Sequence, residues 1–82
     1  MAVDVKTRLR QFREELANPK VSQEAIARQA GLSLQWYRQL ENGLAPNTSW
    51  SSANALLRAF NAERQSRGQD ALTLEQLELN IV

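Results

Sequence analysis

The sequence predicts an all-α fold of five short helices in one domain. Apolar residues recur every three or four positions in several segments, the spacing that places them on one side of a helix. Serine or threonine stands where the later segments begin, as N-cap residues do, and glycine or proline stands near several ends. A chain of 82 residues buries only about 60 to 65% of its unfolded surface. We therefore expect a thin core made by local helix packing.

The first helix is predicted from an apolar stripe with alternating four- and three-residue spacings, made by Val5, Leu9, Phe12 and Leu16. Its other sides carry lysine and arginine, as a solvated face does. Asn18-Pro19 is expected to end this helix, because the residue before a proline is disfavoured in the α region.

The central stretch, residues 22–43, is expected to form two helices joined by a tight turn. Ser22 is a favourable N-cap for the first of them, and Gly31 offers a position where a positive φ causes no Cβ clash. That helix should therefore stop at about Ala30. Ser33 is the N-cap of the second helix, which is expected to run to Asn42 and to be closed by the following glycine.

Two further helices are expected in the last third of the chain. One of the residues 47–49 should cap the fourth helix, whose apolar face is predicted to consist of Trp50, Ala53, Leu56, Leu57 and Phe60. Trp50 is assigned to the core or to a contact between subunits. The polar run 61–71 is interpreted as the tail of this helix and a loop. Thr73 and Gln76 then match a capping box that opens a short fifth helix.

Composition excludes several classes of function. The chain has no histidine and no cysteine, so it lacks the usual zinc ligands and any imidazole or thiol for catalysis. Neither clustered carboxylates nor a glycine-rich phosphate loop is evident, so we expect no metal, no cofactor, no enzyme activity and no small-molecule substrate. No apolar run approaches the roughly 20 residues needed to span a bilayer, and a signal-peptide pattern is missing. We expect a cytoplasmic protein.

The charge distribution gives weak support to a polyanionic partner. The formal net charge is only +1. Residues 1–47 hold seven basic and five acidic side chains, a balance of +2, whereas residues 48–82 hold three basic and four acidic side chains, a balance of −1. We therefore expect any non-specific affinity for DNA to be low and to fall steeply as salt rises.

The central stretch resembles the DNA-binding helix-turn-helix of the Cro and phage-repressor family, often called XRE-like. The matching residues are Ser22-Gln23, Ala27, the turn from Ala30 to Ser33, and the closing run Leu40-Glu41-Asn42-Gly43. The resemblance implies a compact, five-helix, lambda-repressor-like domain over residues 1–82, with the helix-turn-helix at 22–43. It also implies double-stranded DNA as the partner of a bacterial or phage-encoded protein. The link between the first two helices is about three residues longer than is usual in this family.

Helical periodicity places Tyr37 and Leu40 towards the core with Leu32, so the outward face of the second helix consists of Leu34, Gln35, Arg38 and Gln39. Trp36 is expected to straddle core and surface. The resemblance places Ser33, Leu34, Gln35 and Gln39 near base edges, and Ser22, Gln23 and Asn42 near the sugar-phosphate backbone. Arg38 could contact a base or a phosphate. The resemblance also implies a structural, partly buried ion pair between Arg13 and Glu41.

Two functions remain open from the sequence. The first is a sequence-specific transcriptional regulator, probing the major groove as a repressor-type homodimer. The second is a protein-interaction module of the same fold, such as an adaptor or an antitoxin, with weak or no DNA binding. The near-neutral charge, Trp36 and the uncharged loop 44–46 favour the second.

Overall fold

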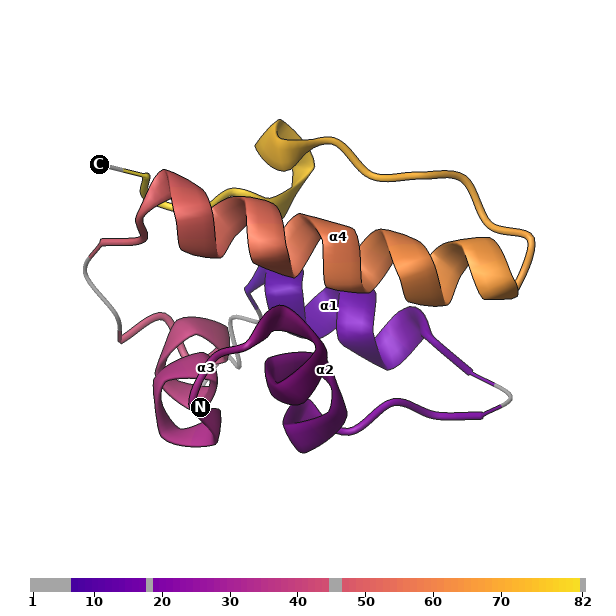
Figure 1. Ribbon diagram of the computed structural model, residues 1–82, viewed down its shortest axis with the longest axis horizontal. Helices are drawn as coiled ribbons and strands as arrows, with labels where there is room; N and C mark the ends of the chain where they lie inside the picture. The colour runs from indigo at the N-terminus through magenta and orange to yellow at the C-terminus, as the bar shows by residue number, and fades with distance from the viewer. Residues whose placement is uncertain (1–6, 18, 45–46, 82) are drawn as a thin grey trace, which may run out of the picture.

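The computed structural model describes residues 7–17, 19–44 and 47–81. Over these residues the chain forms α1 (Arg8–Glu15), α2 (Gln23–Ala30), α3 (Leu34–Glu41), α4 (Trp50–Ser66) and a 3₁₀ helix, η1 (Leu74–Leu77). The long α4 lies across the molecule, with α2 and α3 on one side and the returning C-terminal segment on the other (Figure 1). Helix α2 packs against both α3 and α4, while α1 packs against α3 and η1. The predicted all-α class is confirmed.

Helix α1 is shorter than its apolar stripe predicts. The hydroxyl of Thr7 caps it by accepting from the Arg10 amide at 3.2 Å. The helix ends at Glu15, so the predicted end at Asn18-Pro19 is wrong by about two residues. The reason is that Leu16 adopts an extended conformation and turns its side chain into the core. Val5 and Asn18 lie outside the described residues.

The turn between α2 and α3 has the geometry that its glycine predicts. Gly31 adopts a left-handed conformation with φ of 73°, and the amide of Leu32 returns to the carbonyl of Ala27 at 2.8 Å. Carbonyls at the end of α2 are thereby satisfied in the way that helix C-caps require. The chain then enters α3 through Ser33, whose hydroxyl accepts from the Trp36 amide at 3.2 Å. This turn sets the angle at which α3 leaves the body of the protein.

Helix α4 contributes several fully buried side chains to the core. The hydroxyl of Ser49 caps it, and Ala53, Leu56 and Phe60 are completely buried. The assignment of Trp50 to the core is wrong, because its side chain is 59% exposed. Trp50 is the first residue of α4, and it lines a surface groove with Leu74, Leu79 and Ile81. The core cluster is completed by Leu9, Leu16, Val21, Ile26, Ala27, Tyr37, Leu40, Leu72 and Leu77.

The expected fifth α-helix is not formed in the described residues. Thr73 and Gln76 do meet as a capping box, in which the Gln76 side chain accepts from the Thr73 amide at 2.7 Å. The turn that follows is a four-residue 3₁₀ helix, and Glu78 ends it with a positive φ of 51°. Leu77 is already fully buried at that point, so one tight turn suffices to close the core. The chain then runs to an isolated bridge between Thr48 and Ile81.

Candidate nucleic-acid interface

The outer face of α3 is polar and open to solvent. Tyr37, Leu40 and Glu41 are buried and fix the inner face of the helix against the body. The side chains of Gln35, Arg38 and Gln39 are exposed, as the 3.6-residue period predicts. Ser33 is exposed at the cap, Leu34 is half-buried, and Trp36 is half-buried against the core cluster. Of the residues predicted to read base edges, Ser33, Gln35, Arg38 and Gln39 are therefore exposed along α3, and Leu34 is partly covered.

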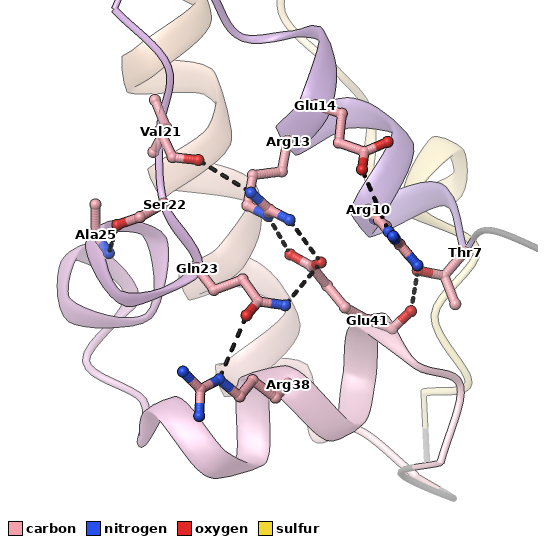
Figure 2. Close-up of polar contacts among 10 residues, drawn as sticks. All are labelled: Thr7, Arg10, Arg13, Glu14, Val21, Ser22, Gln23, Ala25, Arg38 and Glu41. Carbon is pink, nitrogen blue, oxygen red and sulfur yellow. Dashed lines mark hydrogen bonds and ion pairs between the residues drawn. The ribbon is translucent and has the colours of Figure 1, made fainter.

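A buried ion pair anchors α3 to α1. The Arg13 Nε donates to Glu41 Oε2 at 2.6 Å, and its Nη2 donates to Glu41 Oε1 at 3.2 Å (Figure 2). The third nitrogen of Arg13 donates to the carbonyl of Val21 at 3.2 Å. The Glu41 side chain is 0% exposed and that of Arg13 is 18% exposed, so the contact is shielded from solvent. Such a bidentate pair fixes both position and rotation of the two helices.

Gln23 extends this pair across the start of α2. Its Nε2 donates to Glu41 Oε1 at 3.1 Å, and its Oε1 accepts from the Arg38 Nε at 3.3 Å (Figure 2). The family resemblance places Gln23 near the DNA backbone, but both ends of its amide are engaged within the protein. Gln23 thus connects the buried carboxylate to the exposed guanidinium of α3.

The surroundings of Arg13 and Tyr37 shift the pKa values of both side chains. Hydrogen bonding to Glu41 raises the pKa of Arg13 above its ordinary value, although burial acts in the opposite direction. Burial raises the pKa of Tyr37 far above its ordinary value, and the neighbouring Glu41 carboxylate adds to that effect. The Tyr37 hydroxyl is buried without a hydrogen-bond partner among the described residues. Arg13 therefore stays charged and Tyr37 stays neutral across the working range of pH.

The other positions expected near the DNA backbone lie at the ends of the two helices. Ser22 is exposed, and its hydroxyl accepts from the Ala25 amide at 3.1 Å, which caps α2. Asn42 is exposed at the C-cap of α3. Leu44, in the loop that follows, is 71% exposed. Ser22 and Asn42 are thus both exposed, one before α2 and one after α3.

One stabilising residue, Arg67, escapes analysis of the sequence. Its Nε donates to the carbonyl of Ala17 at 3.0 Å, another nitrogen donates to the carbonyl of Pro19, and a third donates to Glu63 Oε2 at 2.6 Å. Arg67 thereby ties the link between α1 and α2 to the end of α4. This link carries Val21, the carbonyl acceptor of Arg13. The pair with Glu63 has the local i,i+4 spacing of a helix, but no local signal reveals the contacts to Ala17 and Pro19, which lie 50 and 48 positions away.

The capped helix pair, its left-handed turn and the exposed face of α3 define the protein as a helix-turn-helix protein. A family model described as "Helix-turn-helix domain" matches residues 7–69. The match spans more than half of the chain, so the protein belongs to this family. Family membership suggests DNA as the ligand.

No curated protein and no solved structure matches the chain. Among the described residues, no helix combines the length and the apolar character needed to cross a bilayer.

Proposed function

We propose that the protein is a sequence-specific DNA-binding transcriptional regulator of the Cro and phage-repressor type, which reads the major groove with α3. The observation that carries this proposal is the division of α3 into two faces. Its inner face is fixed by Tyr37, Leu40 and the buried Glu41, whereas the side chains of Gln35 and Gln39 are exposed to solvent. A rigid helix with outward amides is suited to the groove of a duplex.

The chemistry of this face supports base reading. A glutamine amide carries a donor and an acceptor side by side, which match the N7 and N6 groups of adenine. Gln35 and Gln39 supply two such amides, and Ser33 and Leu34 at the start of α3 add a hydroxyl and an apolar group that suits a thymine methyl. Arg38 is suited to guanine or to a phosphate. Ser22, the N-cap of α2, and Asn42, the C-cap of α3, are proposed to contact the sugar-phosphate backbone.

One α3 offers too few contacts to select a genomic site, so we propose a symmetric homodimer on DNA. Two-fold symmetry places the recognition helices of the two subunits about 34 Å apart, one helical turn of the duplex. A palindromic operator is the expected consequence. With a formal net charge of +1, the complex depends on base contacts more than on bulk electrostatics.

Selection of bound duplexes from a random pool tests this proposal. The expected result is an enriched sequence with two inverted half-sites. Each of Gln35→Ala and Gln39→Ala should then reduce discrimination between the selected operator and random duplex by about 1 to 3 kcal/mol, since each removes one bidentate base contact. Gln65→Ala is the matched control, because Gln65 is an exposed glutamine on α4. Failure to enrich any duplex, or equal discrimination by all three variants and the wild type, contradicts the proposal.

A second function, a protein-interaction module such as an adaptor or antitoxin, is favoured by one observation. Trp50 is 59% exposed and lines a groove of about 280 Å³ whose other apolar walls are Leu74, Leu79 and Ile81. Exposed aromatic side chains beside a groove are typical of protein interfaces. Fluorescence anisotropy with duplex DNA separates the two functions, because an interaction module without DNA activity gives no salt-dependent binding.

A further inference from the structure

Arg38 differs from most other arginines of the described residues in having no carboxylate partner. Six of the eight arginines described contact a glutamate, whereas Arg38 and Arg58 do not. Arg38 instead donates its Nε to a neutral acceptor, the Oε1 of Gln23, at 3.3 Å. Its positive charge is consequently held in place without being neutralised by an adjacent anion.

The contact through Nε also determines which part of the guanidinium is available. Figure 2 shows the two terminal nitrogens of Arg38 on the side turned away from Gln23. Neither of them makes a hydrogen bond to another described residue, so together they form a free fork of donors. A fork of this kind matches two neighbouring acceptor oxygens, as in a carboxylate or a phosphate.

Gln23 is itself held more firmly than an exposed glutamine. Its Nε2 donates to Glu41 Oε1 at 3.1 Å, and Glu41 is fully buried and doubly bonded to Arg13. The orientation of the Gln23 amide is therefore set by the ion pair, which leaves its oxygen pointing at Arg38. The chain of contacts runs from α1 through α3 and the first residue of α2 to the surface of α3.

We propose that Gln23 is a positioning residue that aims the fork of Arg38 at a phosphate of the DNA backbone. This inference rests on the proposed function. Arg38 could contact either a base or a phosphate, and the inference assigns it to the phosphate. The reason is the place of the contact: Arg38 reaches back to the first residue of α2, and the first helix of a helix-turn-helix crosses the sugar-phosphate backbone. Gln23 thus acts on DNA through Arg38 rather than by direct contact.

A double-variant cycle on the selected duplex tests the coupling. We expect Arg38→Ala to weaken binding about tenfold for operator and random duplex alike, and to lower the slope of log K against log salt by about 0.9. Gln23→Ala is expected to weaken binding in the same uniform way, and adding it to Arg38→Ala should cause no further loss. In an Arg38→Lys background, which keeps the charge but removes the fork and Nε, Gln23→Ala should likewise have no further effect.

Two controls test whether the variants fold and whether the coupling is specific to Gln23 and Arg38. Gln23→Met replaces the amide by an apolar group of similar length, and it takes the place of Gln23→Ala in the cycle if the alanine variant disturbs α2. Thermal unfolding reports whether each variant is folded. The losses of binding free energy from Gln23→Ala and Gln35→Ala should be additive, because Gln35 lies outside the chain of contacts.

Additive losses of binding free energy for Gln23→Ala and Arg38→Ala overturn the positioning role. A change of preference at one base pair with an unchanged salt slope for Arg38→Ala overturns the phosphate assignment. Absence of any duplex binding by the wild type instead refutes the proposed function.

Discussion

Replacement of Arg13 by alanine removes the guanidinium that faces the buried carboxylate of Glu41. Three nitrogens of Arg13 are engaged, two with Glu41 and one with the carbonyl of Val21. After the substitution, Gln23 still donates one neutral hydrogen bond to Glu41, which remains 0% exposed in the native arrangement. An anion held in that position by a single amide is under-compensated, because burial disfavours the charged form of a carboxyl group.

The magnitude follows from the burial of the pair. Breaking a buried ion pair by removing one partner costs about 3 to 5 kcal/mol. A domain of 82 residues has a free energy of unfolding of about 4 to 12 kcal/mol at 0.05 to 0.15 kcal/mol per residue. Arg13→Ala should therefore remove at least a quarter of the stability and lower the melting temperature by roughly 12 °C or more.

Urea denaturation followed by circular dichroism measures this loss. Arg10→Ala is the matched control: it is the same substitution on the same helix, and Arg10 lies 3.3 Å from Glu14 with both side chains more than a third exposed. That variant should lose only about 0.3 to 0.5 kcal/mol. Replacing Arg13 and Glu41 together by apolar residues should restore most of the loss, since no unpaired charge remains. A loss for Arg13→Ala below about 1 kcal/mol, the value of an exposed pair, would refute the reasoning.

Three further predictions concern the body of the protein. Arg67→Ala should lower the free energy of unfolding by about 2 to 3 kcal/mol in urea denaturation, because charge-assisted contacts to two carbonyls and Glu63 are lost; a loss equal to that of Arg10→Ala contradicts this. Hydrogen bonds from Gln29 and Arg67 lower the pKa of Glu63, so its contribution is present above the ordinary glutamate pKa of about 4.3 and is lost as pH falls through the lowered value. The stability difference between wild type and Glu63→Gln should accordingly shrink below about pH 4, and a pH-independent difference would rule this out. Gly31→Ala, at φ of 73° with no atom within 4 Å of the added Cβ, should cost about 1 kcal/mol through backbone conformation alone; thermal melts that show no loss would contradict it.

Rules that depend only on neighbouring residues were sufficient to predict the helix-turn-helix from the sequence. Ser22, Gly31 and Ser33 act as expected, because capping and a positive φ depend on residues within a few positions. The outward placement of Gln35 and Gln39 follows from helical period for the same reason. The pairing of Arg13 with Glu41 was implied by the family resemblance rather than by a local rule, and it is present.

Local rules failed where a competing tertiary contact decided the outcome. Leu16 leaves α1 to enter the core, and the capping box at Thr73 opens only a 3₁₀ turn because Leu77 is buried after four residues. Trp50 satisfies the apolar period of α4, yet its side chain is exposed, although Ala53 three positions later is fully buried. Periodicity gives the direction of a side chain but not whether another segment covers it.

The amino-acid sequence by itself determined the helical class, the position of the turn and the face of α3 that meets solvent, since each is set by neighbours within one or two helical turns. Only the tertiary structure decided that the Gln23 amide joins Glu41 to Arg38 and that Arg67 holds the link between α1 and α2. The physical reason is that a hydrogen bond is made between whichever donor and acceptor the packing of helices brings within about 3 Å. Partners separated by 15 to 50 positions leave no periodic trace in the chain.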